Sequence, residues 1–258
     1  MIDTIAQIAL AAVAAILAIT LHETAHGYAA LALGDTTARD AGRLSLNPIR
    51  HIDPVGTLLL PGALLVGQLV TLGRVAFMFG WAKPVPVGAW QFRNPRRGMA
   101  LVAAAGPASN FVLALLGALA LPPAPAPAPA PGPMPGSFAY LDRASALHPW
   151  LAAFLVPFIL YNLVLGLFNL IPLPPLDGGR IAVGLLPAPL AMRWARLERA
   201  GILIVLLVVF VLPAVLSRFG IAFDPFRAVL GRVLPWALRL VLLLTGHHPF
   251  AGMHERFF

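Results

Sequence analysis

The sequence predicts an all-α polytopic membrane protein, and two observations carry that prediction. Of its 258 residues, 59% are hydrophobic and only 11% are charged, with a mean hydropathy of +0.85. A soluble domain of this size has about a quarter of its residues charged. The apolar residues also gather in runs of about 20, which is the length that an α-helix needs to cross the hydrocarbon core.

About five to six apolar segments follow one another along the chain. They cover residues 5–33, 58–81, 99–121, 150–170, 201–216 and 228–244. The last one carries Arg232 and Arg239, which favours an amphipathic helix in the membrane interface over a spanning helix. Alternating prolines at 122–136 predict a stiff, extended connector outside the bilayer.

The second run, 58–81, is interrupted by Pro61, Gly62, Gly67, Gly73 and Arg74. Basic residues precede and follow it, namely Arg39, Arg43 and Arg50 on one side and Lys83, Arg93, Arg96 and Arg97 on the other. Short basic loops stay on the cytoplasmic side of a membrane. We therefore expect 58–81 to be a re-entrant or broken element, beside protein or a water-filled cavity that can satisfy its irregular backbone.

Charge and cysteine usage exclude some classes of partner and site. The net charge is +8, but the basic residues are spread between apolar runs, so they act as topology signals and predict no nucleic-acid partner. The chain has no cysteine, which excludes a disulfide scaffold and a thiolate metal site.

The stretch ITLHETAHGYAALALGD, residues 19–35, places His22, Glu23 and His26 inside the first apolar run. Burying a carboxylate in hydrocarbon costs several kcal/mol unless it is paired, hydrated or bound to metal. His22 and His26 are four residues apart, so on a helix they lie about 40° apart on one face. Two such imidazoles can bind one zinc ion, and in the H-E-x-x-H arrangement the glutamate is the general base for a zinc-bound water. The alternative is a helix whose polar groups pack against neighbouring helices.

A catalytic zinc needs a third protein ligand and an open position. Asp177 is the candidate, because it borders an apolar segment, in FNLIPLPPLDGGR (168–180), with no obvious charge partner. The prolines before it prevent a regular helix, and Gly178 and Gly179 permit a tight turn. The alternative is an aspartate that caps the next helix.

Three motifs together resemble the site-2 protease family of intramembrane zinc metalloproteases, peptidase family M50. They are HETAH, AAAGPASNF (103–111) and NLIPLPPLDGGR (169–180). RHIDPVGTLLLP (50–61) and GWAKPVPV (80–87) resemble its compact prokaryotic branch, which has no PDZ or nucleotide-sensing domain. The resemblance covers most of residues 1–185, which we expect to be the intramembrane metalloprotease core. Residues 186–258 are then C-terminal membrane helices and a tail.

The resemblance implies a three-helix core that holds one Zn²⁺ through His22, His26 and Asp177, with Glu23 as the base. It also implies regulated intramembrane proteolysis, in which transmembrane segments of single-span substrates are cut near the cytoplasmic face of the plasma membrane. A substrate helix must unwind locally before it is cut, and the 58–81 element is a candidate edge for pairing with the unwound strand.

Two amides in or beside the spans, Asn169 and Asn110, are further candidates for binding the substrate backbone or the oxyanion. For Asn110, hydrogen bonding between helices is an equal alternative. We expect His51 to be a solvated loop residue, the alternative being a group that stabilises the transition state. We expect His247, His248 and His254 to belong to a polar tail, the alternative being a second metal cluster.

Other classes fit the sequence less well. The chain has no Gly-x-Ser-Gly site for a serine protease and no Gly-x-Gly-Asp site for an aspartyl protease. A zinc transporter is the main alternative, although transport needs ligands along a path that opens to both faces, often within repeated halves. A non-catalytic zinc-binding membrane scaffold is the other.

Overall fold

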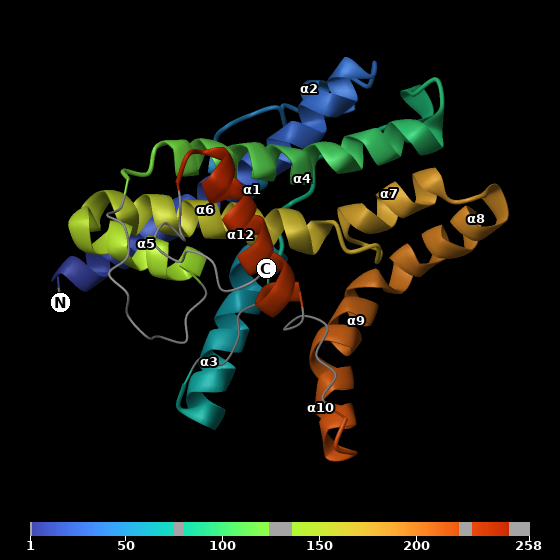
Figure 1. Cartoon of the computed structure of the whole chain (residues 1–258). Coiled ribbons are helices and arrows are strands. Elements are labelled where there is room, and N and C mark those ends of the chain that lie inside the picture. Colours follow the sequence, from blue (N-terminus) through green and yellow to red (C-terminus); the bar gives the residue numbers. More distant parts are fainter. Residues whose placement is uncertain (1, 75–79, 124–135, 222–228, 248–258) are drawn as a thin grey trace, which may run out of the picture.

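A computed structural model describes residues 2–74, 80–123, 136–221 and 229–247, in which all regular elements are helices (Figure 1). This confirms the predicted all-α class. Four helical stretches of the described residues are long and apolar enough to cross a membrane: 4–32, 54–71, 95–119 and 149–169. The chain is therefore a multi-pass membrane protein.

Three long helices pack against one another and form the centre of the molecule: α1 (Ile2–Ala32), α4 (Pro95–Leu119) and α6 (Pro149–Asn169). Small residues line the buried side of α4, among them Ala103, Gly106, Ala114 and Gly117. Lipid tails are as apolar as leucine, so membrane helices associate through close packing, which small residues allow. The glycines and alanines of α4 therefore let α1 and α6 approach its backbone.

Shorter helices surround this bundle. They are α2 (Thr37–Asp40), α3 (Leu60–Leu72), α5 (Gly136–Leu147), α7 (Asp177–Leu185), α8 (Ala188–Arg196), α9 (Gly201–Leu206), α10 (Leu212–Arg218) and α12 (Leu234–Leu244). The expected run 201–216 is divided into α9, a π-helical turn and α10. In Figure 1, α3 and the α9–α10 segment project away from the three-helix bundle.

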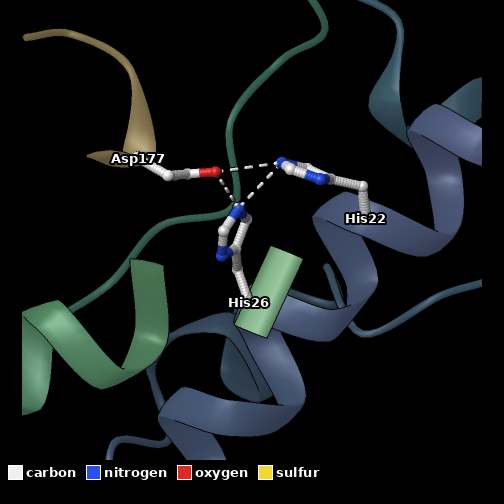
Figure 2. Close-up of side chains that lie close together, drawn as sticks. All are labelled: His22, His26 and Asp177. Carbon is white, nitrogen blue, oxygen red and sulfur yellow. Dashed lines mark hydrogen bonds and ion pairs between the residues drawn. The ribbon is translucent and has the colours of Figure 1, made fainter. Parts of the chain in front are cut away.

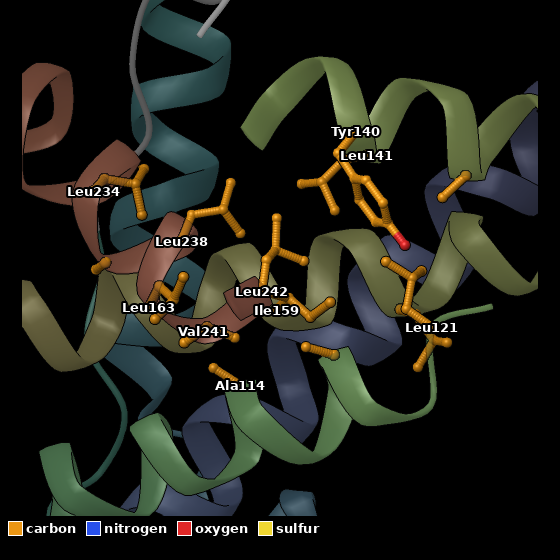
Figure 3. Close-up of a cluster of buried hydrophobic side chains, with 14 residues drawn as sticks. Ala114, Leu121, Tyr140, Leu141, Ile159, Leu163, Leu234, Leu238, Val241 and Leu242 are labelled. Carbon is orange, nitrogen blue, oxygen red and sulfur yellow. The ribbon is translucent and has the colours of Figure 1, made fainter. Parts of the chain in front are cut away.

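Helix α12 closes an apolar cluster with α4, α5 and α6 (Figure 3). Its residues Leu238 and Leu242 are fully buried against Ile159 and Leu163 of α6. Arg232 and Arg239 are exposed, so the segment is amphipathic as predicted, but its apolar face lies on the protein core.

His247, after α12, corrects the expectation of a polar tail. The Tyr140 hydroxyl lies 2.6 Å from its Nδ1, and its Nε2 lies 2.7 Å from the Ala118 carbonyl oxygen. It is buried and ties α12 to α4 and α5. His248 and His254, and residues 124–135 of the predicted proline-rich connector, lie outside the described residues.

The segment between α1 and α4 leaves the bundle and returns to the same point. The Trp81 N–H donates to the Gly56 carbonyl at 3.1 Å, and the Thr57 hydroxyl donates to the Trp81 carbonyl at 2.9 Å. Next to them, the Lys83 N–H donates to the His51 carbonyl at 2.9 Å. The two ends of the 58–81 element therefore meet, as a re-entrant element requires.

The conformation of that element differs from one expectation. A π-helical turn at Pro54–Leu59 leads directly into α3, so the described part of the element is helical up to Leu72. A helix satisfies its own backbone hydrogen bonds and offers no edge to a substrate strand. The proposed pairing edge is therefore not present in residues 58–72.

The paired ends of this element predict its topology. Single cysteines that replace Arg39 and Arg93, before and after the element, should react with a membrane-impermeant maleimide from the same face of the membrane. A cysteine at Asp142, exposed on α5, should react from the opposite face. The native chain has no cysteine that would interfere. Labelling of Arg39→Cys and Arg93→Cys from opposite faces would mean that the element crosses the membrane.

Candidate metal centre

Three side chains from two distant parts of the chain converge, namely His22 and His26 of α1 and Asp177 at the start of α7 (Figure 2). The Nε2 atoms of His22 and His26 are 3.1 Å apart. Asp177 Oδ2 lies 3.2 Å from Nε2 of His22 and 3.3 Å from Nε2 of His26. The exposed fractions of the three residues are 4%, 9% and 7%, so the structure brings these predicted ligands together in a buried place.

The spacing of these three atoms fits one face of a zinc tetrahedron. Zinc binds imidazole nitrogen and carboxylate oxygen at about 2.0–2.2 Å, which places tetrahedral ligands about 3.3 Å from one another. Asp177 Oδ2 is buried and accepts no hydrogen bond. A buried carboxylate oxygen without a donor is costly, and a cation between the three atoms would satisfy it. The donor set therefore fits zinc, with one tetrahedral position left for a water or a substrate atom.

Each imidazole also has a hydrogen-bond partner for Nδ1, the ring nitrogen that does not belong to the converging trio. His26 Nδ1 lies 2.8 Å from the Val102 carbonyl oxygen, and His22 Nδ1 lies 2.6 Å from Asn110 Oδ1. A carbonyl oxygen only accepts, so Nδ1 of His26 carries the proton and Nε2 has a free lone pair. Metal-binding histidines characteristically donate their second ring nitrogen in this way.

Asp177 is the first residue of α7, and its position depends on two glycines. A Cβ atom on Gly178 would lie 2.3 Å from the Leu170 carbonyl oxygen, and one on Gly179 would lie 2.5 Å from the Pro174 nitrogen. Only glycine permits this close approach of the chain to itself. Leu176 occupies the N-cap position of the helix, so the structure does not favour the capping alternative for Asp177.

The charge of Asp177 suits a ligand. Burial raises the pKa of its carboxyl group, but in the metal-free protein hydrogen bonds from protonated His22 and His26 and their positive charge lower it by more, to about 2. The carboxylate is therefore ionised at neutral pH, and ionised is the form in which carboxylates bind metal.

Glu23 is half-buried and lies outside the converging trio. Its Oε2 accepts the Val85 N–H at 3.2 Å. Val85 belongs to a stretch without regular secondary structure, 80–88, whose end is fixed by the Gly88 N–H donating to Asp35 Oδ2 at 2.7 Å. Pro84 and Pro86 flank Val85 and have no N–H of their own. The stretch thus holds the carboxylate next to the histidine pair with a single backbone donor.

Gly106 of the AAAGPASNF motif is a site residue that the sequence alone does not predict. A Cβ atom there would lie 2.5 Å from the His26 ring and 2.6 Å from the His22 ring. Helix α4 can therefore cover the two imidazoles only because this residue has no side chain.

The two predicted substrate amides have other contacts. Asn110 is fully buried, and it bonds to His22 with Oδ1 and to Asn162 with Nδ2, so its polar atoms face the protein. This matches the alternative of bonding between helices and does not favour a substrate role. Asn169 Nδ2 donates to the Leu165 carbonyl of its own helix at 3.0 Å. No described contact joins Asn169 to the three ligands.

His51 also differs from expectation, because it is buried in the loop after α1. Its Nε2 lies 2.8 Å from the Ser45 carbonyl oxygen, which also accepts the Thr24 hydroxyl at 3.1 Å. Through the shared Ser45 carbonyl, His51 therefore links this loop to Thr24 of α1, the residue that follows Glu23.

Comparisons with known proteins assign the chain to a family. The model of peptidase family M50 matches residues 132–213, which include Asp177. The Bacillus subtilis protein named "Putative zinc metalloprotease YwhC" is 40% identical over 198 residues, covering 77% of this chain and 78% of that protein. The chain belongs to peptidase family M50. It is accordingly a metalloendopeptidase.

A second relative lies further away. The Mycolicibacterium smegmatis protein named "Putative zinc metalloprotease Rip2" is 30% identical over 166 residues, covering 63% of this chain and 52% of that protein. No solved structure matches the chain. The family assignment therefore rests on sequence similarity.

The close packing of α4 against the two imidazoles predicts that adding one methyl group at Gly106 reduces zinc binding. In a helix, alanine is normally favoured over glycine by about 1 kcal/mol. Gly106→Ala should nevertheless strongly reduce bound zinc, because the new methyl group displaces both rings. Gly67→Ala on α3, where a Cβ atom meets nothing within 4 Å, is the control and should keep zinc. Metal analysis of the purified variants checks this, and a Gly106→Ala protein with full zinc would contradict the described packing.

Proposed function

We propose that this M50 peptidase is a zinc-dependent intramembrane endopeptidase that cuts transmembrane segments of single-span membrane proteins. The observation that supports it is the trio of His22, His26 and Asp177 atoms at tetrahedral spacing, buried between apolar helices. In this proposal the three residues hold one Zn²⁺, and residues 1–185 form the catalytic unit because every residue of the site falls within them.

Glu23 acts as the general base. Zinc at the site would lower the pKa of a bound water toward 7 and polarise the scissile carbonyl. Glu23 takes the proton from the attacking water and gives it to the nitrogen of the leaving amine. The hydrogen bond from the Val85 N–H holds the carboxylate in place through both transfers. Asn169 remains a candidate contact for the substrate backbone.

The position of the site supports cleavage near the cytoplasmic face of the plasma membrane. His22 and His26 lie in the last third of α1, and Asp177 follows the end of α6. The basic loops after α1 and α6 and before α4 are at that same end of the bundle. Positively charged loops favour the cytoplasmic side. The ligands are therefore nearer the cytoplasm than the opposite surface.

The substrate must enter this site unfolded. A transmembrane helix satisfies its carbonyl groups with its own hydrogen bonds, so the scissile carbonyl becomes accessible only after local unwinding.

The zinc transporter and the non-catalytic scaffold are weaker alternatives. Transport needs a series of ligands along a path. Within the described part of the chain, only His22, His26 and Asp177 form a group of three metal-ligating side chains. A scaffold would not need a carboxylate held beside the ligands as Glu23 is.

Two variants should distinguish the proposed base from the proposed metal ligands. Wild type and Glu23→Gln should each contain about one zinc per chain, and Asp177→Ala much less. Glu23→Gln should lower the cleavage rate of a single-span substrate in liposomes by about 10²–10⁴-fold, the usual worth of a general base. Asp142→Asn, an exposed carboxylate on α5, is the control and should change neither property.

Two results would overturn the assignment. Unchanged cleavage by Glu23→Gln would remove the base from the mechanism. Zinc uptake into protein-containing liposomes without cleavage of any substrate would favour the transporter.

The need for unwinding predicts a substrate preference. Glycine destabilises a helix relative to leucine by several tenths of a kcal/mol to about 1 kcal/mol. Replacing leucines beside the cleaved bond of a single-span substrate with glycine should therefore raise the cleavage rate several-fold. The same replacements in the other half of that span serve as the control. Faster cleavage of the leucine version would show that unwinding does not limit access.

A further inference from the structure

A chain of buried hydrogen bonds runs from the back of His22 through two other helices. His22 Nδ1 on α1 lies 2.6 Å from Asn110 Oδ1 on α4. Asn110 Nδ2 donates to Asn162 Oδ1 on α6 at 2.7 Å, and Asn162 Nδ2 donates to the Phe158 carbonyl at 2.8 Å. Both asparagines are fully buried, so water cannot replace any of these bonds.

The direction of each bond follows from the last acceptor. The Phe158 carbonyl only accepts, so the amide nitrogen of Asn162 must face it and Oδ1 must face Asn110. Asn110 must then turn its own nitrogen toward Asn162, where it also reaches the Ala18 carbonyl at 3.5 Å. Its oxygen is left facing His22. An amide placed the other way would leave buried polar groups unpaired.

We propose that Asn162, acting through Asn110, is a positioning residue that holds His22 in the form that binds metal. With an oxygen opposite Nδ1, the ring must carry its proton there and turn the Nε2 lone pair toward His26 and Asp177. The inference rests on the proposed zinc site and adds two residues to it.

The two histidines are held in different ways. His26 donates directly to a backbone carbonyl, that of Val102, which no substitution removes. His22 depends on a side-chain amide, and the orientation of that amide depends on a residue in a third helix. Correct placement of His22 is therefore linked to the packing of α1, α4 and α6 together.

Zinc affinity, measured by competition with a chelator, tests the relay. Outer partners of metal-binding histidines typically contribute about 10–100-fold to affinity. Asn110→Leu should fall in that range, and Asn162→Leu should weaken zinc binding about tenfold although it touches no ligand. The double variant should be no weaker than Asn110→Leu, because Asn162 acts only through Asn110.

Two further variants separate positioning from folding. Asn110→Asp keeps an oxygen opposite His22 Nδ1 in either protonation state and should restore most of the affinity lost in Asn110→Leu. Ser109→Ala removes a bond that stays within α4, from the Ser109 hydroxyl to the Gly106 carbonyl, and should leave affinity unchanged. If Asn110→Leu does not fold, Asn162→Leu compared with Ser109→Ala decides the question.

The tautomer itself gives a second measurement. In zinc-free protein labelled with nitrogen-15 histidine, the His22 signal should report a proton on Nδ1, and Asn162→Leu should produce a mixture. His22→Ala assigns the signal and also tests the site. Retention of zinc in His22→Ala would overturn the proposed metal centre. Loss of zinc there, with unchanged zinc affinity and an unchanged tautomer in Asn162→Leu, would overturn the relay alone.

Discussion

The structure depends on bringing two imidazoles and one carboxylate within about 3.3 Å of each other in an apolar surrounding, the spacing that tetrahedral zinc requires. Without a cation this arrangement leaves a buried carboxylate oxygen unsatisfied. Three glycines of the core make this arrangement sterically possible. Gly106 lets α4 cover the rings, and Gly178 and Gly179 let the chain after α6 turn Asp177 toward them.

The three-helix bundle supplies both rigidity and exclusion of lipid. Its helices meet through small residues and through the Asn110–Asn162 pair, where the unfavourable burial of polar groups is offset by hydrogen bonds. The ends of the segment from Gly56 to Trp81 are joined by a hydrogen bond, and the irregular stretch that follows donates one backbone N–H to Glu23. The proposed metal ligands and the proposed base are thus held by separate parts of the fold.

Features that follow from local periodicity could be predicted from the sequence. The helical period places His22 and His26 on one face, and prolines followed by glycines mark Asp177 as a residue in an irregular turn. Features set by the register between helices could not. The roles of Asn162 and Gly106 depend on which residues of the neighbouring helices they contact. His51 and His247 are buried because their ring nitrogens pair with carbonyl oxygens elsewhere in the chain. The helical state of 58–72 also could not be predicted, because Pro61, Gly62 and Gly67 suggest a broken backbone.

X-ray absorption at the zinc edge of the purified protein tests the central claim most directly. We expect nitrogen and oxygen neighbours at about 2.0–2.2 Å and the outer scattering of two imidazoles, with no sulfur, since the chain has no cysteine. The signal of one imidazole should disappear in His26→Ala. Three or more imidazoles, or a six-coordinate oxygen shell unchanged by that substitution, would contradict the proposed ligand set of His22, His26 and Asp177.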